Sequence, residues 1–314
     1  MSFSSEVKEE LSRHFETGRH CQIAEIAAVI HFLGRLEEDL DGRKVLKVYT
    51  ENVALAKKYF TLIKQTFEVN ANIAIRQNAY LHKGRTCIIS IGDPDETNRI
   101  LQAVKWKNDD AGFRRSEGIV DRMLVKSTCC RRSFIRGAFL SSGSMSDPEK
   151  SYHFEIVCSD SEKASHLMEI INSFSMDAKI VQRKKCYVVY LKEGSQIVDI
   201  LNIMGAHVAL MNLENVRILK EMRNFVNRQV NCETANINKT VNAAVKQIED
   251  ITFIQNSVGF DSLSEGLQEI AELRLKFPES TLKELGSMLN PTVGKSGVNH
   301  RLRKLSNIAD DLRK

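Results

Sequence analysis

The chain has 314 residues, of which 42% are hydrophobic, 27% are charged and only 4 are prolines. This composition is typical of a helix-rich globular protein of two or three domains, and it excludes low-complexity disorder as the main state. The 45 basic and 40 acidic residues leave a formal net charge of +5, which favours polyanionic partners only where it is concentrated.

The first half of the chain begins a repeated pattern of helices and strands. An apolar helix, residues 23–33, runs into Gly34 and is followed by a turn signal at Asp41-Gly42. The pattern then predicts a strand at 45–49, a helix at 52–67 and strands at 73–75 and 87–91. The apolar helix is interrupted by charge and is too short to cross a bilayer, so we expect no membrane contact.

The second copy follows with the same order of elements. A helix at 133–142 runs into Gly143, and a turn at Asp147-Pro148 follows. The next elements are a strand at 153–157, a helix at 161–174, and strands at 178–181 and 186–191. The glycines Gly34 and Gly143 lie 109 positions apart, as do the helix starts at Asn52 and Ser161. Such a repeat with hairpins predicts an α+β domain with pseudo-twofold symmetry rather than a parallel sheet.

After Gly205 the strand pattern stops, and the remaining chain is expected to be all α-helical. A helix is predicted at 212–226, a polar, asparagine-rich linker or capped turn at 227–238, and another helix at 239–254. The expected domains are therefore the repeat domain at 1–210, with copies at about 15–106 and 125–205, a linker at 211–238 and a helical domain at 239–314.

The last three helices are predicted at 264–277, 281–289 and 297–312. The sequence Thr281-Leu282-Lys283-Glu284 is a capping box that starts the second helix, and Gly286 allows a close helix crossing. Leucines at 282, 285 and 289 form the apolar stripe of this helix. In the third helix, the residues expected to face inward are Val298, Leu302, Leu305, Ala309 and Leu312.

Another face of the third helix has the residue types that read DNA. Ser296, Asn299, His300 and Arg303 recur at helical spacing, and Lys295, Arg301 and Lys304 flank them. Polar side chains at the start of a recognition helix reach base edges in the major groove, while Arg and Lys neutralise phosphates. Five basic residues and one acidic residue lie between Lys283 and Lys304, so the excess charge is concentrated here. The alternative is a solvated face of a small helical bundle.

A second basic cluster lies between the two copies and in the start of the second. Its candidate phosphate contacts are Arg114, Arg115, Arg131, Arg132 and Arg136, with Arg122 and Lys126 nearby. Arginines of this kind serve equally often as structural partners of carboxylates.

No enzyme or cofactor signature was found, since the chain has no Walker loop, G-x-G-x-x-G, H-E-x-x-H or G-x-S-x-G. The seven cysteines include no C-x-x-C, and the adjacent Cys129 and Cys130 lack the spacing of a chelating pair. We therefore expect reduced core thiols, no thiolate zinc site, no bound metal, no cofactor and no small-molecule substrate. The charged start of the chain has no signal-peptide pattern, which predicts a cytoplasmic location.

The two helices that end in Gly34 and Gly143 resemble the paired motif helices of LAGLIDADG homing endonucleases. Small residues at Ala28, Gly137 and Ala138 suit the close helix crossing of that family. The family's metal-binding acid precedes the final glycine, where this chain has Leu33 and Ser142. Neither side chain binds Mg²⁺, so the resemblance implies a degenerate domain without catalysis.

Together with the C-terminal helix-turn-helix, this pattern resembles the WhiA family of bacterial DNA-binding proteins over essentially the whole chain. The resemblance rests on the start Met-Ser-Phe-Ser-Ser-Glu-Val-Lys-Glu-Glu-Leu, on residues 136–140 and 235–240, on Asn227-Arg228 with Asn231, and on residues 295–302. It implies a nucleoid-associated transcriptional regulator that binds double-stranded DNA and acts in cell division, chromosome segregation and, in some relatives, sporulation. Other regulatory or cell-division proteins are further candidate partners.

Two alternatives stay open at the level of sequence. The chain could be an active endonuclease with displaced acids such as Glu37 or Asp39, or a protein-interaction scaffold with incidental DNA affinity. Metal-dependent plasmid nicking distinguishes the first alternative, and full DNA affinity after neutralising the arginine cluster at 131–136 distinguishes the second.

Overall fold

The structure is a computed structural model that describes residues 2–38, 42–77, 85–106 and 120–313. It divides into two compact units, Met1–Lys220 and Glu221–Lys314, each with its own hydrophobic core. Among the described residues, no helix is both long and apolar enough to cross a membrane.

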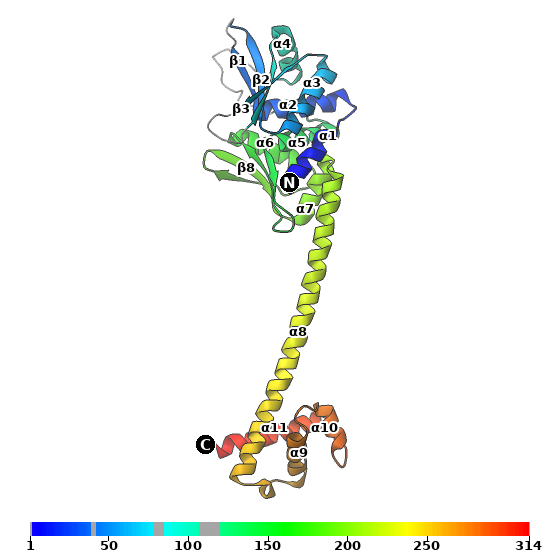
Figure 1. Cartoon of the computed structure of the whole chain (residues 1–314), viewed down its shortest axis with the longest axis vertical. Helices are drawn as coiled ribbons and strands as arrows, with labels where there is room; N and C mark the ends of the chain where they lie inside the picture. The colour runs from blue at the N-terminus through cyan, green and yellow to red at the C-terminus, as the bar shows by residue number, and fades with distance from the viewer. Residues whose placement is uncertain (1, 39–41, 78–84, 107–119, 314) are drawn as a thin grey trace. The chain divides into compact units, whose positions relative to one another are not determined.

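The N-terminal unit starts with helix α1 (Phe3–Arg13) and then contains the same order of elements twice, as the repeat predicted (Figure 1). The first copy consists of α2 (Arg19–Leu33), β1 (Gly34–Glu38), β2 (Lys44–Thr50), α3 (Val53–Phe67), β3 (Asn72–Gln77), β4 (Arg85–Ile91) and α4 (Pro94–Ala103). The second copy consists of α5 (Thr128–Ser142), β5 (Gly143–Met145), β6 (Phe154–Cys158), α6 (Ser161–Asn172), β7 (Lys179–Arg183), β8 (Cys186–Leu191) and α7 (Gly194–Met204). The helices α4 and α7, which close the two copies, were not predicted.

Each copy forms a four-stranded antiparallel sheet, in the orders β1-β2-β4-β3 and β5-β6-β8-β7. In β4, Cys87, Ile89 and Ile91 are buried and alternate with half-buried side chains, as expected for a sheet with one face on a core. The predicted α+β class with hairpins is confirmed. Of the predicted turn at Asp41-Gly42, Asp41 lies outside the described residues, and Gly42 has a φ of 73°, which suits a turn.

Equivalent side chains begin the fourth element of each copy, the helix α3 or α6. The Asn52 carboxamide oxygen accepts hydrogen bonds from the amides of Ala54 and Leu55, at 2.9 and 3.2 Å, at the start of α3. The Asp160 carboxylate accepts from the Lys163 amide, at 2.8 Å, at the start of α6. Such caps satisfy amides that have no partner within the helix, so the chain switches from strand to helix at the same place in both copies.

Helices α2 and α5 pack against each other between the two sheets, and buried residues of both copies join in a single core. Gly137 of α5 lies at this crossing. A Cβ atom there would be 2.7 Å from the Glu25 carbonyl oxygen and 2.8 Å from the Ala28 Cβ. Since real side chains do not approach so closely, the crossing requires glycine at position 137, where a small residue was predicted.

The helix α8 (His207–Ser257) corrects one prediction. The polar stretch 227–238 was expected to be a linker or turn between two helices, but the structure has continuous helix there. The physical reason is that residues 207–257 contain neither glycine nor proline, and asparagine lowers helix propensity only modestly. The C-terminal unit continues with a short 3₁₀ turn (Phe260–Ser262), α9 (Glu265–Lys276), α10 (Leu282–Met288) and α11 (Lys295–Leu312).

Candidate nucleic-acid interface

The last three helices pack around one apolar core, which fixes the orientation of α11. Thr281 and Glu284 form the predicted capping box, with the Thr281 amide donating to the Glu284 carboxylate at 2.7 Å. Leu285 and Leu289 are buried, and Leu282 is half-buried against the same core. A Cβ at Gly286 would be 2.1 Å from the Val293 carbonyl oxygen, so glycine permits the loop before α11 to pass close to α10.

The inner face of α11 matches the predicted stripe with one exception. Val298, Leu302, Leu305 and Ala309 are buried in the core, as predicted. Leu312, which was also expected to face inward, is 40% exposed. It ends α11 about one turn beyond Ala309, the last buried residue of the stripe, so it extends past the core.

The outer face of α11 carries most of the predicted DNA-reading side chains. Lys295, Ser296, His300, Arg303 and Lys304 are all exposed. At 100° per residue, His300 lies 200° from the buried Val298 and therefore points away from the core. Asn299 is half-buried, because it lies at the edge between the buried stripe and the exposed face. His300 is thus placed further outward than Asn299.

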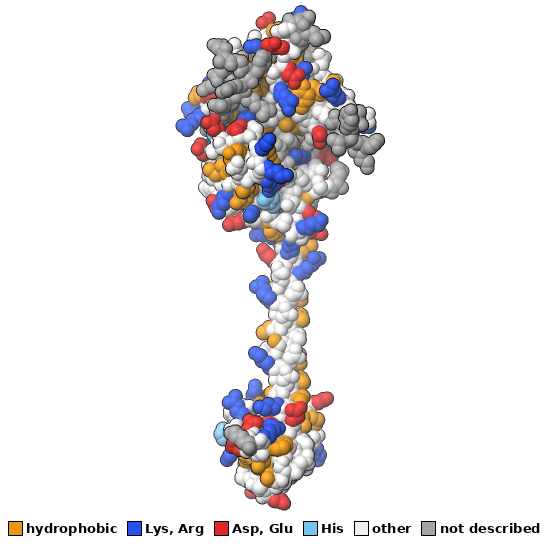
Figure 2. Space-filling view, turned by 90° about the vertical axis from the view of Figure 1, so that its left-hand side faces the viewer, with side chains coloured by type: hydrophobic (Ala, Val, Ile, Leu, Met, Phe, Trp, Pro, Cys, Tyr) orange, Lys and Arg blue, Asp and Glu red, His pale blue; other side chains and the backbone are white. Residues whose placement is uncertain are grey.

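The electrostatics of this face suit a polyanion. The first ten residues of α11, Lys295–Lys304, contain basic side chains and no acidic one. The N-cap, Gly294, makes no side-chain capping hydrogen bond, which leaves the first amides of the helix available to an anion. Figure 2 shows Lys and Arg side chains and one His on the surface of the C-terminal unit, with Asp and Glu side chains among them.

Arg301 has a different place from the other basic residues of α11. Its guanidinium is half-buried, and Nη1 donates a 3.2 Å hydrogen bond to the Gly266 carbonyl at the start of α9. A Cβ at Gly266 would lie 3.3 Å from the Arg301 Cζ, so glycine leaves room for this contact. Arg301 therefore connects α11 to α9, in addition to any contact with DNA.

The predicted phosphate contacts in the N-terminal unit need correction. Arg136 is only 2% exposed, so it does not reach a phosphate. The Arg132 guanidinium donates to the carbonyls of Ile203 and Asn202 at the end of α7, both at 3.1 Å. Arg131 is half-buried with its guanidinium carbon 5.6 Å from the centre of the Phe174 ring. Arg114 and Arg115 lie outside the described residues.

Arg136 belongs to a buried network of charges beneath the α2–α5 crossing. Its guanidinium contacts the carboxylates of Glu25, at 3.2 Å, and Glu16, at 2.8 Å, and donates to the Met204 carbonyl at 2.7 Å. The Lys58 ammonium pairs with the same Glu25 and donates to the Leu11 carbonyl at 2.9 Å.

Burial lowers the pKa of Lys58, although the Glu25 carboxylate partly opposes this. The pKa of Glu16 is lowered overall, because the hydrogen bonds from Arg136 and His14 outweigh burial. Charge count at the sequence level cannot distinguish such a network from a phosphate-binding surface.

The positions that carry metal-binding acids in LAGLIDADG enzymes have no acid here. Leu33 is apolar, and the Ser142 hydroxyl donates to the Val157 carbonyl at 2.8 Å. The displaced acid Glu37 has both carboxylate oxygens occupied, by Tyr49 Oη at 2.7 Å and Lys47 Nζ at 2.8 Å. These partners lower the pKa of Glu37, with the Lys47 contact the largest cause. The other displaced acid, Asp39, lies outside the described residues.

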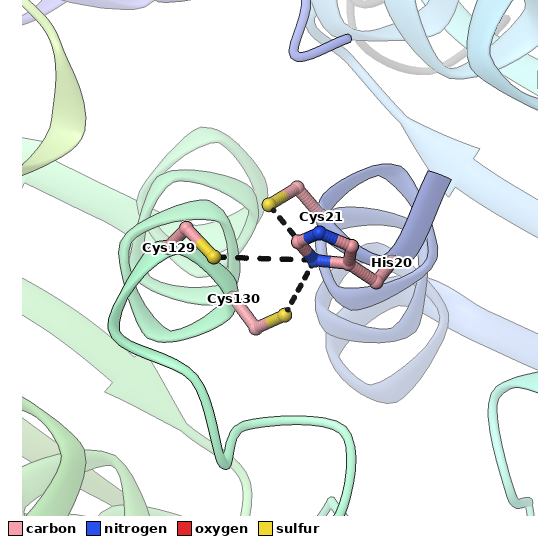
Figure 3. A group of neighbouring side chains, drawn as sticks. All are labelled: His20, Cys21, Cys129 and Cys130. Atoms are coloured by element: carbon pink, nitrogen blue, oxygen red, sulfur yellow. Dashed lines mark hydrogen bonds between the residues drawn. The ribbon is translucent and has the colours of Figure 1, made fainter. Parts of the chain in front are cut away.

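One cluster was missed at the sequence level. His20, Cys21, Cys129 and Cys130 come together at the start of α2 and α5 (Figure 3). C-x-x-C spacing does not reveal this cluster, because the two pairs of ligands are far apart in the chain. The signal that could have found it is the repeat, since His20 and Cys129, like Cys21 and Cys130, lie 109 positions apart.

Three family models match the chain. They are the WhiA N-terminal LAGLIDADG-like domain at residues 19–105, the WhiA LAGLIDADG-like domain at 131–223 and the WhiA C-terminal HTH domain at 226–309. Together the matches cover most of both copies of the repeat and the helices α9, α10 and most of α11, which agrees with the expected LAGLIDADG-like domain followed by a helix-turn-helix domain.

Similar proteins include two that are named "Probable cell division protein WhiA". The one from Lachnoclostridium phytofermentans is 57% identical over 314 residues, with 100% of each chain covered. The one from Alkaliphilus oremlandii is 52% identical, with 99% of this chain and 98% of the relative covered. The crystal structure of full-length DUF199/WhiA from Thermatoga maritima is 24% identical with a TM-score of 0.61 and covers 99% of both chains, which shows a common fold.

Proposed function

The chain belongs to the WhiA family, and on that premise we propose that it is a sequence-specific, non-enzymatic DNA-binding protein that regulates transcription. The observation that carries the proposal is the outer face of α11. Ser296, His300 and Arg303 are exposed on it, and Lys295–Lys304 contains no acid. Such a helix N-terminus in the major groove reads base edges, while the adjacent Lys and Arg bind phosphates.

The side chains divide into two roles according to their position along α11. Ser296, Asn299 and His300 lie in the first two turns and are proposed to contact bases. Arg303 and Lys304 lie further along, where the helix leaves the groove, and are proposed to contact phosphates. Lys295 and Arg301 are proposed as additional phosphate contacts. The loss of a base contact typically costs about 1 to 3 kcal/mol and relaxes preference at one position. The loss of a phosphate contact weakens binding to all sequences and lowers the salt slope by about one.

A salt-dependent binding titration tests this division on two duplexes, a target taken from genome-wide occupancy and its scrambled version. We expect His300→Ala and Asn299→Ala to lower the ratio of specific to random affinity, with the larger effect at the more exposed His300. We expect Lys304→Ala to lower both affinities and to leave their ratio nearly unchanged. If only Lys304→Ala changes the ratio, the proposed orientation of α11 is wrong.

The absence of enzyme activity is a second part of the proposal. It is supported by Leu33 and Ser142 at the positions of the metal-binding acids and by the occupied carboxylate of Glu37. Hydrolysis by paired divalent ions requires carboxylate ligands at the scissile phosphate. We expect no nicking of supercoiled plasmid by the purified chain with Mg²⁺ or Mn²⁺, and no micromolar site for either ion by calorimetry. Metal-dependent nicking that persists after purification to homogeneity would contradict this part.

The cellular role proposed for the chain follows from its relatives, two of which are named as probable cell division proteins. We propose that it is nucleoid-associated and acts on genes of cell division and chromosome segregation. The test is chromatin immunoprecipitation of the chain in its own cells, with the α11 double variant His300→Ala, Lys304→Ala as control. Occupancy near division genes that the double variant loses supports the role, and occupancy unrelated to such genes contradicts it.

A further inference from the structure

Four side chains that commonly bind soft metal ions meet at the N-terminal ends of α2 and α5 (Figure 3). His20 and Cys21 belong to the first turn of α2, and Cys129 and Cys130 to the first turn of α5. The His20 Nδ1 lies 3.2 Å from the Cys130 sulfur, 3.3 Å from the Cys21 sulfur and 3.9 Å from the Cys129 sulfur. All four ligand atoms lie within 4.8 Å of one another.

The internal repeat explains why these residues meet. His20 is equivalent to Cys129, and Cys21 is equivalent to Cys130, with the same offset of 109 that relates Gly34 to Gly143. The two helices of the crossing therefore present equivalent pairs of neighbouring residues, and the pseudo-twofold arrangement brings the pairs together. Each helix supplies two ligands, which is why no C-x-x-C motif is needed.

The distances fit a tetrahedral ion. Zinc bonds of about 2.3 Å to sulfur and about 2.0 Å to nitrogen place tetrahedral ligand atoms roughly 3.5 to 3.8 Å apart. The measured separations of 3.2 to 3.9 Å from the histidine nitrogen bracket this range. Cys21 and Cys130 are buried, while His20 and Cys129 are exposed. One side of the group therefore faces the core, and a metal ion can reach the ligands from solvent on the other side.

A neighbouring hydroxyl supports a metal-bound thiolate. Ser133, one turn along α5 from the cysteine pair, is 0% exposed, and its side chain interacts with that of Cys21. Among the described residues, its Oγ has no partner in an ordinary hydrogen bond. A buried hydroxyl without a well-formed hydrogen bond is costly, and a zinc-bound Cys21 thiolate would be a stronger acceptor for its hydrogen than the neutral thiol.

From this geometry we propose that His20, Cys21, Cys129 and Cys130 bind one zinc ion in a structural site, in which the protein supplies all four ligands. Three cysteines and one histidine form an established set of ligands for structural zinc, and the soft thiolates disfavour Mg²⁺ and Ca²⁺, which bind oxygen. The ion links the two copies of the repeat at the start of the crossing helices. It lies at the opposite end of these helices from Leu33 and Ser142, so it is unrelated to the metal position of the endonucleases.

Metal content of the full-length chain tests the proposal. The chain is purified under reducing conditions without chelator and analysed by inductively coupled plasma mass spectrometry. We expect one zinc per chain after dialysis and a lower thermal midpoint after removal by a strong chelator, restored by added Zn²⁺. Cys130→Ser and His20→Asn should lose the metal. The matched control Cys232→Ser, an exposed cysteine on α8, should retain it.

Replacement of zinc by Co²⁺ tests the coordination itself. We expect the intense visible bands of tetrahedral cobalt and a near-ultraviolet charge-transfer band from thiolate, both absent in His20→Asn, whose exposed position should leave the fold intact. Ser133→Ala should weaken affinity for Zn²⁺ about 10-fold, the effect typical of losing a hydrogen bond to a ligand. The proposal is overturned if the reduced chain retains no zinc, if cobalt shows the weak bands of octahedral coordination, or if mass spectrometry finds a Cys21–Cys130 disulfide in anaerobically purified protein.

Discussion

The close crossing of α2 and α5 makes Gly137→Ala a sensitive test of the fold. The added Cβ would lie 2.7 Å from the Glu25 carbonyl oxygen and 2.8 Å from the Ala28 Cβ. Since uncrowded carbon contacts lie at about 3.5 Å or more, the helices must separate by roughly 0.7 Å. Overpacking of this kind costs about 1 to 3 kcal/mol, and the better helix propensity of alanine offsets about 1 kcal/mol of it. We expect a net loss of up to about 2 kcal/mol for alanine and a larger loss for Gly137→Leu.

The assay is thermal unfolding of the full-length chain by calorimetry. A loss of this size lowers the midpoint of the N-terminal unit by a few degrees, at about 2 to 4 °C per kcal/mol. The control is Gly194→Ala at the start of α7, where the new Cβ would be 3.5 Å from the Tyr152 ring, an ordinary contact. Its midpoint should be unchanged or slightly higher. If Gly137→Ala is as stable as the control, the two helices do not approach each other as described.

Two further predictions concern buried charge. Burial, with smaller effects of Lys163 and His166, lowers the pKa of His31 to about 4 from 6.5, so the unfolded chain binds more protons between these values. In urea titrations, the contribution of His31 to the free energy of unfolding should therefore be fully present above pH 6.5 and should fall by about 3 kcal/mol on acidification to pH 4. The variant His31→Phe should lack this pH-dependent decrease. Arg136→Met leaves Glu25 with one partner fewer and should cost about 3 to 5 kcal/mol, whereas the exposed Arg183→Met should cost less than about 1 kcal/mol. Equal costs would show that the Arg136 network does not stabilise the fold.

The repeat and the C-terminal helices could be predicted because local signals mark their ends. Gly34 and Gly143 follow equivalent helices, Asn52 and Asp160 cap equivalent helices, and the Thr281 capping box begins α10. Each signal acts through neighbouring residues, so it is visible in the sequence. The helix α4 has such a signal too, because Asp93 caps it and Pro94 occupies its first turn, but its short apolar pattern gave no reason to add a helix.

The continuity of α8 was not predicted from the sequence, because the asparagine-rich composition of residues 227–238 favoured a turn, whereas the structure has continuous helix there. Asparagine is common in turns, and the stretch 227–238 has few large apolar residues. Apolar residues such as Val230 and Ile237 occur in it, but both are more than half exposed, so burial gives no pattern to read. Residues 207–257 contain no glycine or proline to end a helix. This absence indicates a continuous helix more reliably than the asparagine content indicates a turn.

The roles of the arginines could not be predicted from charge either, and this changes how the N-terminal unit should be tested for DNA contact. Neutralising Arg132 or Arg136 removes hydrogen bonds to the end of α7, so a loss of DNA affinity would not distinguish a missing contact from a disturbed fold. Arg122 and Lys126 come from the same basic cluster and are exposed. If this surface binds phosphates, Arg122→Ala with Lys126→Ala should weaken binding to target and scrambled duplexes equally and lower the salt slope by about two, with an unchanged melting temperature. Full affinity in this double variant would assign DNA binding to the C-terminal unit and leave the α5 arginines with a purely structural role.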